Sequence, residues 1–520
     1  MEQHNFNVKM TKILMVVLVF AVVMSMIGGM NILKNNYYFN WRFLDWSRNC
    51  VQAEIAWYRS GGNVPVVPDT NKADLIPILV YHGVISDPKW RPDGVNVSTQ
   101  EFTEQMFALK RAGWRTITME DYLAYIAGQK QVPEKSFLLT FDDGRKDSYY
   151  NGDPVIRTVG YNAVMFVITG RSLGPGNETQ PFHLSQIELQ KMADSGRWEM
   201  GSHTQNGHGT IPIDAAGDQG HFLSNLMWIS DQHRLETVDE YKERVTADLT
   251  GARNDIETKL GVASPSFAYP YGDLGQGSSN FPQGQVILTE IVKSIYSAAF
   301  IQVGNNDFIT NTADDSFLSK RIGIDSSVLP GQLVTMLDNA RFKPLDYADN
   351  FTSDKGWLRG WGGLTIDGGQ MLISTTQEDD SASTFLSGSS LWKNYIFSAR
   401  INVLKGDSFE LVAYKDENNY ATCDFSGDWA ALTQAAGGGS GHDQEIATTT
   451  LKNAIAPGAV LDAALKVEGN TATCYLNGNQ IFSGNISGTL DRRGIGFKTW
   501  DSLGTGSEFS VTNLKVSQVF

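Results

Sequence analysis

Leu138-Leu139-Thr140-Phe141-Asp142-Asp143-Gly144 is the stretch around which the chain is organised. The largely apolar run over 136–141 is typical of a buried strand, and it ends at two adjacent carboxylates. Neighbouring side chains on a strand point to opposite faces, so both carboxylates can serve one cleft only beyond the strand, where the backbone turns at Gly144. An acidic pair beside glycine is more often a solvated turn, so the rest of the sequence has to decide.

Length and composition indicate a folded protein of more than one domain. A chain of 520 residues is too long for one ordinary domain and predicts two domains with an appended segment. The 41% of hydrophobic and 19% of charged residues argue against disorder. Lys and Arg number 42 against 57 Asp and Glu, which gives a net charge of −15 without a basic cluster. Nucleic acid is therefore excluded as an expected partner.

The three cysteines are too few for a disulfide scaffold. Cys423 and Cys474 both fall in strand-like runs of the C-terminal region. They either pair, if the protein is extracytoplasmic, or remain two buried free thiols. Cys50 follows the N-terminal apolar segment, and the sequence assigns it no role.

Residues 13–33 form an apolar run long enough to cross a bilayer as a helix. Lys9 and Lys12 precede it, which favours a cytoplasmic N-terminus and an exported remainder. A cleaved signal peptide is the alternative, but the run is long for one and no small-x-small cleavage site follows it. We therefore expect a cytoplasmic tip and uncleaved transmembrane anchor over 1–34, with a single-pass protein at the cell membrane.

An α/β domain is expected over 75–342, after a juxtamembrane helix and linker over 35–74. Strand-like and helix-like runs alternate in it, which predicts parallel strands with helices outside, as a barrel or a doubly wound sheet. The expected strands are 76–81, 136–141, 163–168, 198–202 and 266–269. The expected helices are 37–58 before the linker, then 99–112, 184–195, 238–260 and 331–340.

An all-β domain is expected over 350–520, where glycine is frequent and the helical pattern is lost. Asn477-Gly478 between two strand-like runs is a strong hairpin signal. The pattern predicts a β-sandwich, most simply a jelly roll. The expected strands are 395–404, 409–414, 420–425, 465–467, 471–476 and 509–516.

Polar side chains follow several of the expected α/β strands. His82, the pair Asp142-Asp143, and the histidines His203 and His208 all lie at or just after strand ends. In parallel α/β folds these ends form the ligand face. Two imidazoles and one carboxylate form a three-ligand set typical of a catalytic divalent metal, and a second carboxylate can act as base. The five-residue spacing of the histidines indicates a loop that folds back, because on a helix they would face different ways.

Three segments resemble the principal motifs of polysaccharide deacetylases of carbohydrate esterase family 4. They are Thr140-Phe141-Asp142-Asp143-Gly144, residues 203–208, and Tyr269-Pro270-Tyr271-Gly272, in order on three expected strand ends. The histidine spacing and a first strand ending in Tyr81-His82 are most similar to the deacetylases of poly-β-1,6-N-acetylglucosamine. The resemblance covers about residues 75–337 and implies a distorted (β/α) barrel.

The resemblance also implies the metal site and the base. Asp143, His203 and His208 would hold a divalent metal, with Zn²⁺ favoured and Ni²⁺, Co²⁺ or Fe²⁺ as alternatives. Asp142 would be the general base for the attacking water. The metal's charge would keep that carboxylate ionised.

The remaining implied roles concern the oxyanion, the acid and the orientation of the base. The backbone N–H of Tyr271 would stabilise the oxyanion, and His82 would protonate the leaving amine. Many family members have an arginine two residues before the proline of the third motif, where this chain has Ala268. Arg321 is the expected substitute, and Tyr269 is a further candidate for orienting the base or binding substrate.

The C-terminal domain resembles concanavalin-like jelly rolls that bind carbohydrate. Tryptophans at Trp361, Trp429 and Trp500 are candidates for stacking on sugar rings. Most of the tryptophans here are more simply explained as core residues. The domain can equally be a spacer or a protein-docking unit.

The expected function is therefore metal-dependent N-deacetylation by a membrane-anchored, extracytoplasmic enzyme. The favoured substrate is poly-β-1,6-N-acetylglucosamine, with peptidoglycan or chitin oligomers as alternatives. An inactive cell-surface glycan-binding protein is the alternative of another class, and a structural envelope protein is a third. The paired carboxylates and histidines favour the enzyme, because a binding protein needs no base beside a metal.

Overall fold

The computed structural model describes residues 37–62, 71–177, 180–304, 311–312, 317–376, 380–416, 419–435, 444–486, 493–501 and 503–520. The transmembrane segment expected over 13–33 lies outside these residues. Within the described part of the chain, no helix is both long and apolar enough to span a membrane.

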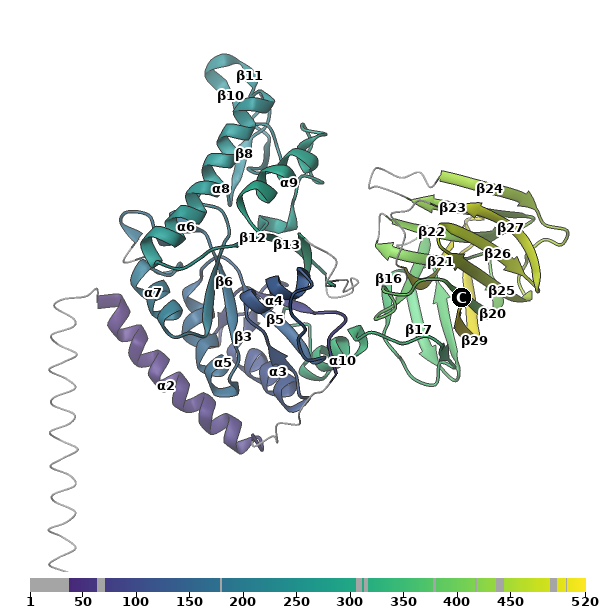
Figure 1. Cartoon of the computed structure of the whole chain (residues 1–520), viewed down its shortest axis with the longest axis horizontal. Helices are drawn as coiled ribbons and strands as arrows, with labels where there is room; N and C mark the ends of the chain where they lie inside the picture. Colours follow the sequence, from purple (N-terminus) through teal and green to yellow (C-terminus); the bar gives the residue numbers. More distant parts are fainter. Residues whose placement is uncertain are drawn as a thin grey trace, which may run out of the picture.

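A closed parallel barrel forms the first domain (Figure 1). Its strands follow the order β1-β14-β13-β12-β7-β6-β5, and β5 pairs back to β1. β1 pairs in parallel with both neighbours, since Leu79 lies opposite Leu139 of β5 and Ile322 of β14. The barrel strands are β1 (Ile78–Tyr81), β5 (Ser136–Phe141), β6 (Ala163–Val167), β7 (Trp198–Ser202), β12 (Ser266–Ala268), β13 (Ala298–Val303) and β14 (Leu318–Gly323), and β4 (Arg115–Thr116) adds to the edge of β5.

Helices cover the outside of the barrel, as the alternating sequence pattern predicts (Figure 1). The longest, α8, begins after a capping box in which Thr237 accepts from the backbone of Glu240, and it ends at Gly261 in a left-handed conformation. The helices are α3 (Thr99–Arg111), α4 (Met119–Ile126), α5 (Asp153–Val159), α6 (Thr169–Ser172), α7 (Gln186–Asp194), α8 (Val238–Leu260), α9 (Gly284–Ile295) and α10 (Pro330–Ala340).

Helix α2 (Tyr37–Arg59) lies along the barrel next to α5, confirming the helix expected over 37–58 (Figure 1). The buried carboxylate of Asp153 joins it to the domain. Trp46 Nε1 donates to this carboxylate at 2.8 Å, and Trp198 Nε1 donates to it at 2.7 Å. A charged acceptor that satisfies two indoles ties α2 to β7 and α5.

Short strands extend from the barrel between β7 and α8. The hairpins β8–β9 and β10–β11 occupy this insertion, and β10–β11 lies at its far end (Figure 1). Their bounds are β8 (Thr210–Pro212), β9 (Gln219–His221), β10 (Trp228–Ile229) and β11 (Arg234–Leu235). A parallel pair, β2 (Val84–Ile85) and β3 (Val97–Ser98), follows β1.

Two antiparallel sheets pack face to face in the C-terminal domain. One has the order β17-β18-β29-β20-β25-β26-β27, with β15 beside β29, and the other β16-β19-β28-β21-β22-β23-β24. The strands are β15 (Tyr347–Asp349), β16 (Trp357–Trp361), β17 (Gly363–Asp367), β18 (Gln370–Ser374), β19 (Ser381–Leu386), β20 (Tyr395–Lys405), β21 (Ser408–Asp416), β22 (Asn419–Ser426), β23 (Trp429–Ala435), β24 (Gln444–Thr450), β25 (Val460–Glu468), β26 (Thr471–Leu476), β27 (Asn479–Asn485), β28 (Gly494–Trp500) and β29 (Glu508–Gln518).

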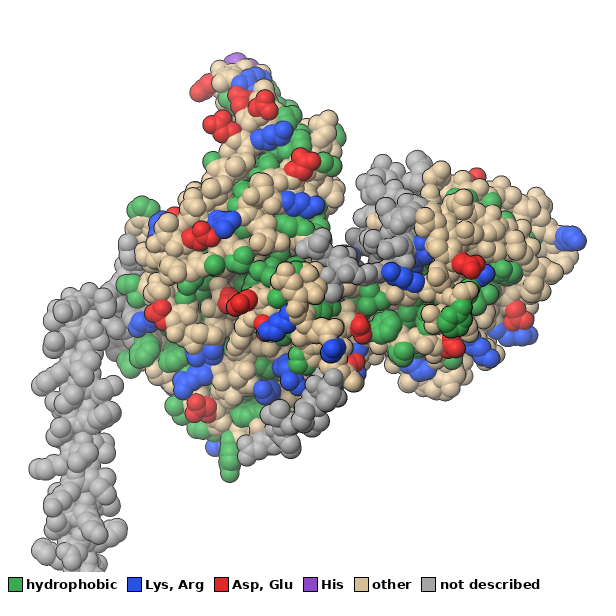
Figure 2. Space-filling view, in the orientation of Figure 1, with side chains coloured by type: hydrophobic (Ala, Val, Ile, Leu, Met, Phe, Trp, Pro, Cys, Tyr) green, Lys and Arg blue, Asp and Glu red, His purple; other side chains and the backbone are tan. Residues whose placement is uncertain are grey.

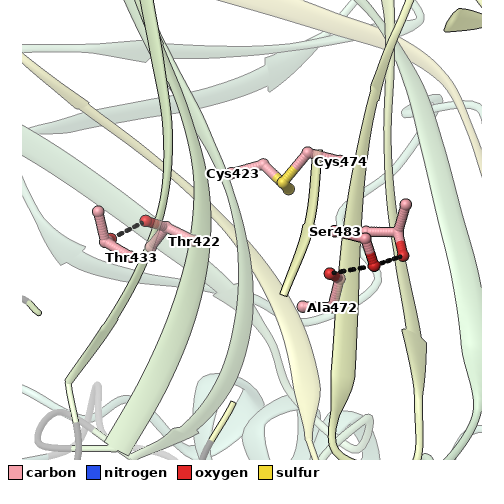
Figure 3. Close-up of a disulfide and its surroundings, with 7 residues drawn as sticks. Thr422, Cys423, Thr433, Ala472, Cys474 and Ser483 are labelled. Atoms are coloured by element: carbon pink, nitrogen blue, oxygen red, sulfur yellow. Dashed lines mark hydrogen bonds between the residues drawn. A yellow bond between two sulfur atoms is a disulfide. The ribbon is translucent and has the colours of Figure 1, made fainter. Parts of the chain in front are cut away.

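A disulfide joins the two sheets through their shared core (Figure 3). Cys423 comes from β22 and Cys474 from β26, and both are fully buried. Of the two possibilities left open by the sequence, the structure therefore has the paired cysteines. Cys50 is the free thiol of the described chain and is buried in α2.

Candidate active site

A cavity of about 580 Å³ opens at the carboxyl ends of the barrel strands. Its lining includes residues at or just beyond the ends of six barrel strands. Six of the lining residues are the candidates predicted at strand ends, namely His82, Asp142, Asp143, His203, His208 and Tyr271. Closure of the barrel brings these ends together, because parallel strands all point the same way.

Asp142 is held by a bidentate ion pair with Arg321. Arg321 Nη1 and Nη2 donate to the two carboxylate oxygens at 2.6 and 2.7 Å. The guanidinium is fully buried and also donates to Thr140 Oγ1 at 3.2 Å. Burial raises the pKa of the Asp142 carboxyl, but Arg321 and then His203 lower it by more, so the pKa lies below its ordinary value. The carboxylate is therefore ionised and fixed in orientation.

Asp143, His203 and His208 point donor atoms at one place. One ligand atom from each lies within 4.8 Å of the others. His208 Nε2 lies 3.3 Å and His203 Nε2 lies 3.7 Å from Asp143 Oδ1. Two imidazole nitrogens and one carboxylate oxygen that converge in this way fit a divalent metal with open positions.

The other nitrogen of each imidazole is already engaged. His203 Nδ1 donates to the carbonyl oxygen of Ala268 at 2.8 Å. His208 Nδ1 lies 3.3 Å from the hydroxyl of Tyr271. The carbonyl can only accept, so it fixes the tautomer of His203 that leaves Nε2 free to bind a metal. Burial lowers the pKa of His203 to about 4, so this ring is neutral near pH 7, as a ligand must be.

Three site residues have a left-handed backbone that side chains other than glycine rarely adopt. The φ angles are 71° at Asp143, 76° at Thr204 and 61° at Tyr271. His183 Nδ1 donates to the carbonyl oxygen of Asp143 at 2.9 Å and holds one of these turns. Strained residues gather at a site when surrounding contacts hold them, and here each follows the end of a barrel strand.

An acidic residue of α8 holds the loop between the two histidines. Asp248 accepts the backbone N–H groups of Gln205 at 3.1 Å and of Asn206 at 2.7 Å. Burial raises the pKa of Asp248, and these N–H donors offset part of the increase. The loop that separates His203 from His208 is thus fixed from the outside of the barrel.

Residues 129–280 match the family model described as polysaccharide deacetylase. This part of the chain is a polysaccharide deacetylase domain. The match contains both carboxylates, both histidines and the Tyr271 segment, and it agrees with the resemblance to carbohydrate esterase family 4.

Curated relatives of the deacetylase domain include poly-β-1,6-N-acetyl-D-glucosamine N-deacetylases. The protein of Escherichia coli K12 is 27% identical over 188 residues, which are 34% of this chain and 28% of that protein. The protein of Staphylococcus aureus MSSA476 is 25% identical over 177 residues, which are 34% of this chain and 54% of that protein. The matched region thus spans little more than a quarter to about half of these relatives' length. A solved de-N-acetylase from Aggregatibacter actinomycetemcomitans aligns at 21% identity with a TM-score of 0.43, covering 51% of this chain and 100% of that one.

Tyr269 does not lie where it was expected. The deacetylase domain buries its ring, 1% exposed, against Phe267 at 5.0 Å, and Tyr269 is absent from the cavity lining. Its backbone continues β12 by donating to Phe300, so its side chain packs outward in the cluster under α8 and α9. The prediction that the Tyr269 side chain binds substrate or orients the base is therefore wrong. Arg321 contacts Asp142 instead.

The candidate tryptophans lie on β16, β23 and β28, all in one sheet of the C-terminal domain, and none of them lines the deacetylase cavity. Trp361 is 39% and Trp500 is 43% exposed, whereas Trp429 is half-buried. Trp361 lies opposite Ser383 and Trp500 opposite Ser381, so both side chains occur on the same face of the sheet. Glycan binding by them stays a prediction.

Several residues of the deacetylase site were not singled out from the sequence. His183, His221 and Asp248 each contact a cavity residue or the loop that carries one, and Gln302 and Asp325 line the cavity itself. Gln302 is the second-last residue of β13 and Asp325 follows β14, two strands that the periodicity did not reveal. Had β13 and β14 been predicted from the sequence, the position of Gln302 and Asp325 near the ends of these strands would have marked both residues as candidates.

Proposed function

We propose that this chain is a metal-dependent N-deacetylase of an extracellular N-acetylglucosamine polymer, with poly-β-1,6-N-acetylglucosamine as the favoured substrate. The observation that carries the proposal is the pairing, in one cavity, of an Arg321-held Asp142 with the converging donors of Asp143, His203 and His208. The names of the curated relatives support this choice of polymer.

Asp143, His203 and His208 would hold the cation, and we propose Zn²⁺ because the ligand set is rich in imidazole nitrogen. When bound, such an ion polarises the acetamide carbonyl and makes water easier to deprotonate. Ni²⁺, Co²⁺ and Fe²⁺ suit the same donors and are outcomes of the metal test.

The chain's own residues move the protons. Asp142 accepts a proton from the water that attacks the acetamide carbon, and Arg321 keeps its oxygens aimed. The backbone N–H of Tyr271 donates to the oxygen on which negative charge develops. The carbon–nitrogen bond then breaks as His82, which lines the cavity, donates a proton to the departing amine. The products are acetate and a glucosamine unit.

We also propose that the enzyme is attached to the cell membrane with its deacetylase domain outside the cytoplasm. The apolar run over 13–33 with preceding lysines supports this topology. The Cys423–Cys474 disulfide supports it independently, because such bonds persist in oxidising compartments.

Acidic and basic side chains are interspersed on the face seen in Figure 2, which fits a neutral or weakly cationic polymer better than nucleic acid.

Acetate release by the purified full-length chain tests the proposed function. Substrates would be β-1,6- and β-1,4-linked N-acetylglucosamine oligomers, after chelation and again after Zn²⁺ is restored. We expect zinc-dependent release from the β-1,6 series that Asp142→Asn abolishes, because the amide cannot take the proton. Preference for the β-1,4 series would move the substrate to chitin or peptidoglycan. Zinc binding without release from either series would favour a glycan-binding protein.

A further inference from the structure

His221 and Asp273 form a hydrogen-bonded pair beside the cavity, with the histidine partly exposed and the aspartate buried. The proposed chemistry does not use this pair. His221 ends β9 in the insertion between β7 and α8, and its Nδ1 donates to Asp273 Oδ2 at 2.6 Å. Asp273 is only 6% exposed, and its second oxygen accepts the backbone N–H of Gly275 at 2.9 Å. Both oxygens of this carboxylate are therefore engaged, which fixes the imidazole it holds.

The His221 ring lies flat against Tyr271. The two ring centroids are 4.3 Å apart and the planes differ by 9°. Tyr271 is 56% exposed and has a φ of 61°, so neither burial nor backbone preference holds its side chain in place. Stacking on a fixed imidazole is the contact that can do so.

On its other side, Tyr271 meets a metal-ligand candidate. Its ring lies 4.8 Å from that of His208, and its hydroxyl lies 3.3 Å from His208 Nδ1. The hydroxyl is thus placed to accept from His208 Nδ1 when Nε2, which faces Asp143, binds a metal. Tyr271 lines the cavity, whereas His221 does not, so any effect of His221 on the cavity passes through Tyr271.

We propose that His221 and Asp273 are positioning residues: they clamp the Tyr271 ring so that its hydroxyl fixes His208 and its backbone N–H stays at the cavity. The proposal rests on the proposed function, since it assigns these residues to the same site. The order of contacts is Asp273 to His221 to Tyr271 to His208.

A double-mutant cycle on zinc affinity tests the route through Tyr271. We expect His221→Ala and Tyr271→Phe each to weaken Zn²⁺ binding about 10-fold, the lower end for outer partners of metal ligands. The double variant should be no weaker than Tyr271→Phe, because the two changes remove one contact route. Effects that multiply would overturn the proposal. His233→Ala is the matched control, since His233 is exposed on the same insertion.

A metal-free measurement separates this proposal from the proposed function. In the apo protein, nuclear Overhauser contacts between the Tyr271 and His208 rings, whose centroids are 4.8 Å apart, should be strong, and His221→Ala should weaken them. Unchanged contacts between these two rings in His221→Ala would refute the clamp whether or not the wild type releases acetate. His221→Ala should also lower kcat more than it raises KM, a split that a general loss of stability would not produce.

Discussion

A single guanidinium determines the state of the proposed base. Arg321 and Asp142 are both almost fully buried, and their two parallel hydrogen bonds compensate charges that would otherwise be costly to desolvate. The position two residues before the proline of the third motif is Ala268, and the cation that contacts Asp142 comes from β14. β14 lies on the opposite side of β1 from β5, the strand that Asp142 follows.

Arg321→Met should remove the counter-charge and leave the Asp142 carboxylate buried alone. We expect a loss of about 3–5 kcal/mol in the free energy of unfolding, as for other broken buried pairs, and loss of acetate release. Urea unfolding with acetate assays would measure both. Asp142→Asn combined with Arg321→Met removes both charges and should recover part of the stability but no activity. A single Arg321→Met variant as stable as the wild type would contradict this assignment.

At the scale of elements, α8 reaches the site by holding a loop. Asp248 lies on its inner face and accepts two consecutive backbone N–H groups between the paired histidines. The Asp255 carboxylate, about two turns further along, accepts from Gln205 Nε2 at 2.9 Å and Thr169 Oγ1 at 3.0 Å. The loop is thus fastened to a helix that itself begins and ends with strong caps.

Asp248→Ala should therefore weaken metal binding without touching a ligand. We expect Zn²⁺ affinity to fall about 10- to 100-fold, as when a ligand's outer partner is lost. The unfolding free energy should fall by about 1–3 kcal/mol, because two buried N–H groups lose their acceptor. Competition with a chromophoric chelator would measure the affinity. Glu243→Ala, at an exposed position of the same helix, is the control, and equal affinities in the two variants would refute the role of Asp248.

At the scale of the whole molecule, two domains are joined through a short, partly exposed connection after α10. Lys343 N donates to Gly388 at 2.9 Å, and Trp392 Nε1 donates to Lys343 at 2.6 Å, so the connection packs onto the sandwich. Arg341 Nε donates to Glu134 at 2.9 Å on the barrel side. These contacts seat the sandwich beside the barrel (Figure 1). Burial lowers the pKa of Lys343 to about 8.

The Cys423–Cys474 disulfide should stabilise the sandwich selectively. It closes a separation of 51 residues, for which loop entropy predicts about 4 kcal/mol. Replacing both cysteines with alanine, or adding a reductant, should lower the thermal midpoint of the sandwich and leave acetate release by the barrel intact. Differential scanning calorimetry would measure the midpoint. As a control, Cys50→Ala should leave the drop in thermal midpoint on adding reductant as it is in the wild type. An unchanged midpoint after both Cys423 and Cys474 are replaced would show that the disulfide does not stabilise the sandwich.

The sequence by itself determined the features that depend on neighbours along the chain. β5, β7, β26 and α8 have the bounds that the periodicity predicted, and the turn at Asn477-Gly478 has the positive φ angles its residues favour. Six of the cavity residues were also expected in advance, because a parallel barrel gathers whatever follows its strands.

Only the tertiary structure decided the features that join distant segments. β14 was missed because its sequence, Leu318–Gly323, carries Lys320 and Arg321, and its pairing with β1 hides the charge of Arg321 inside the barrel. The disulfide, the outward turn of Tyr269 and the stacking of His221 on Tyr271 likewise depend on which strands lie side by side. A local pattern records the period of one element, whereas barrel closure and sheet packing set the distances between elements, and the arrangement of the site follows from those distances.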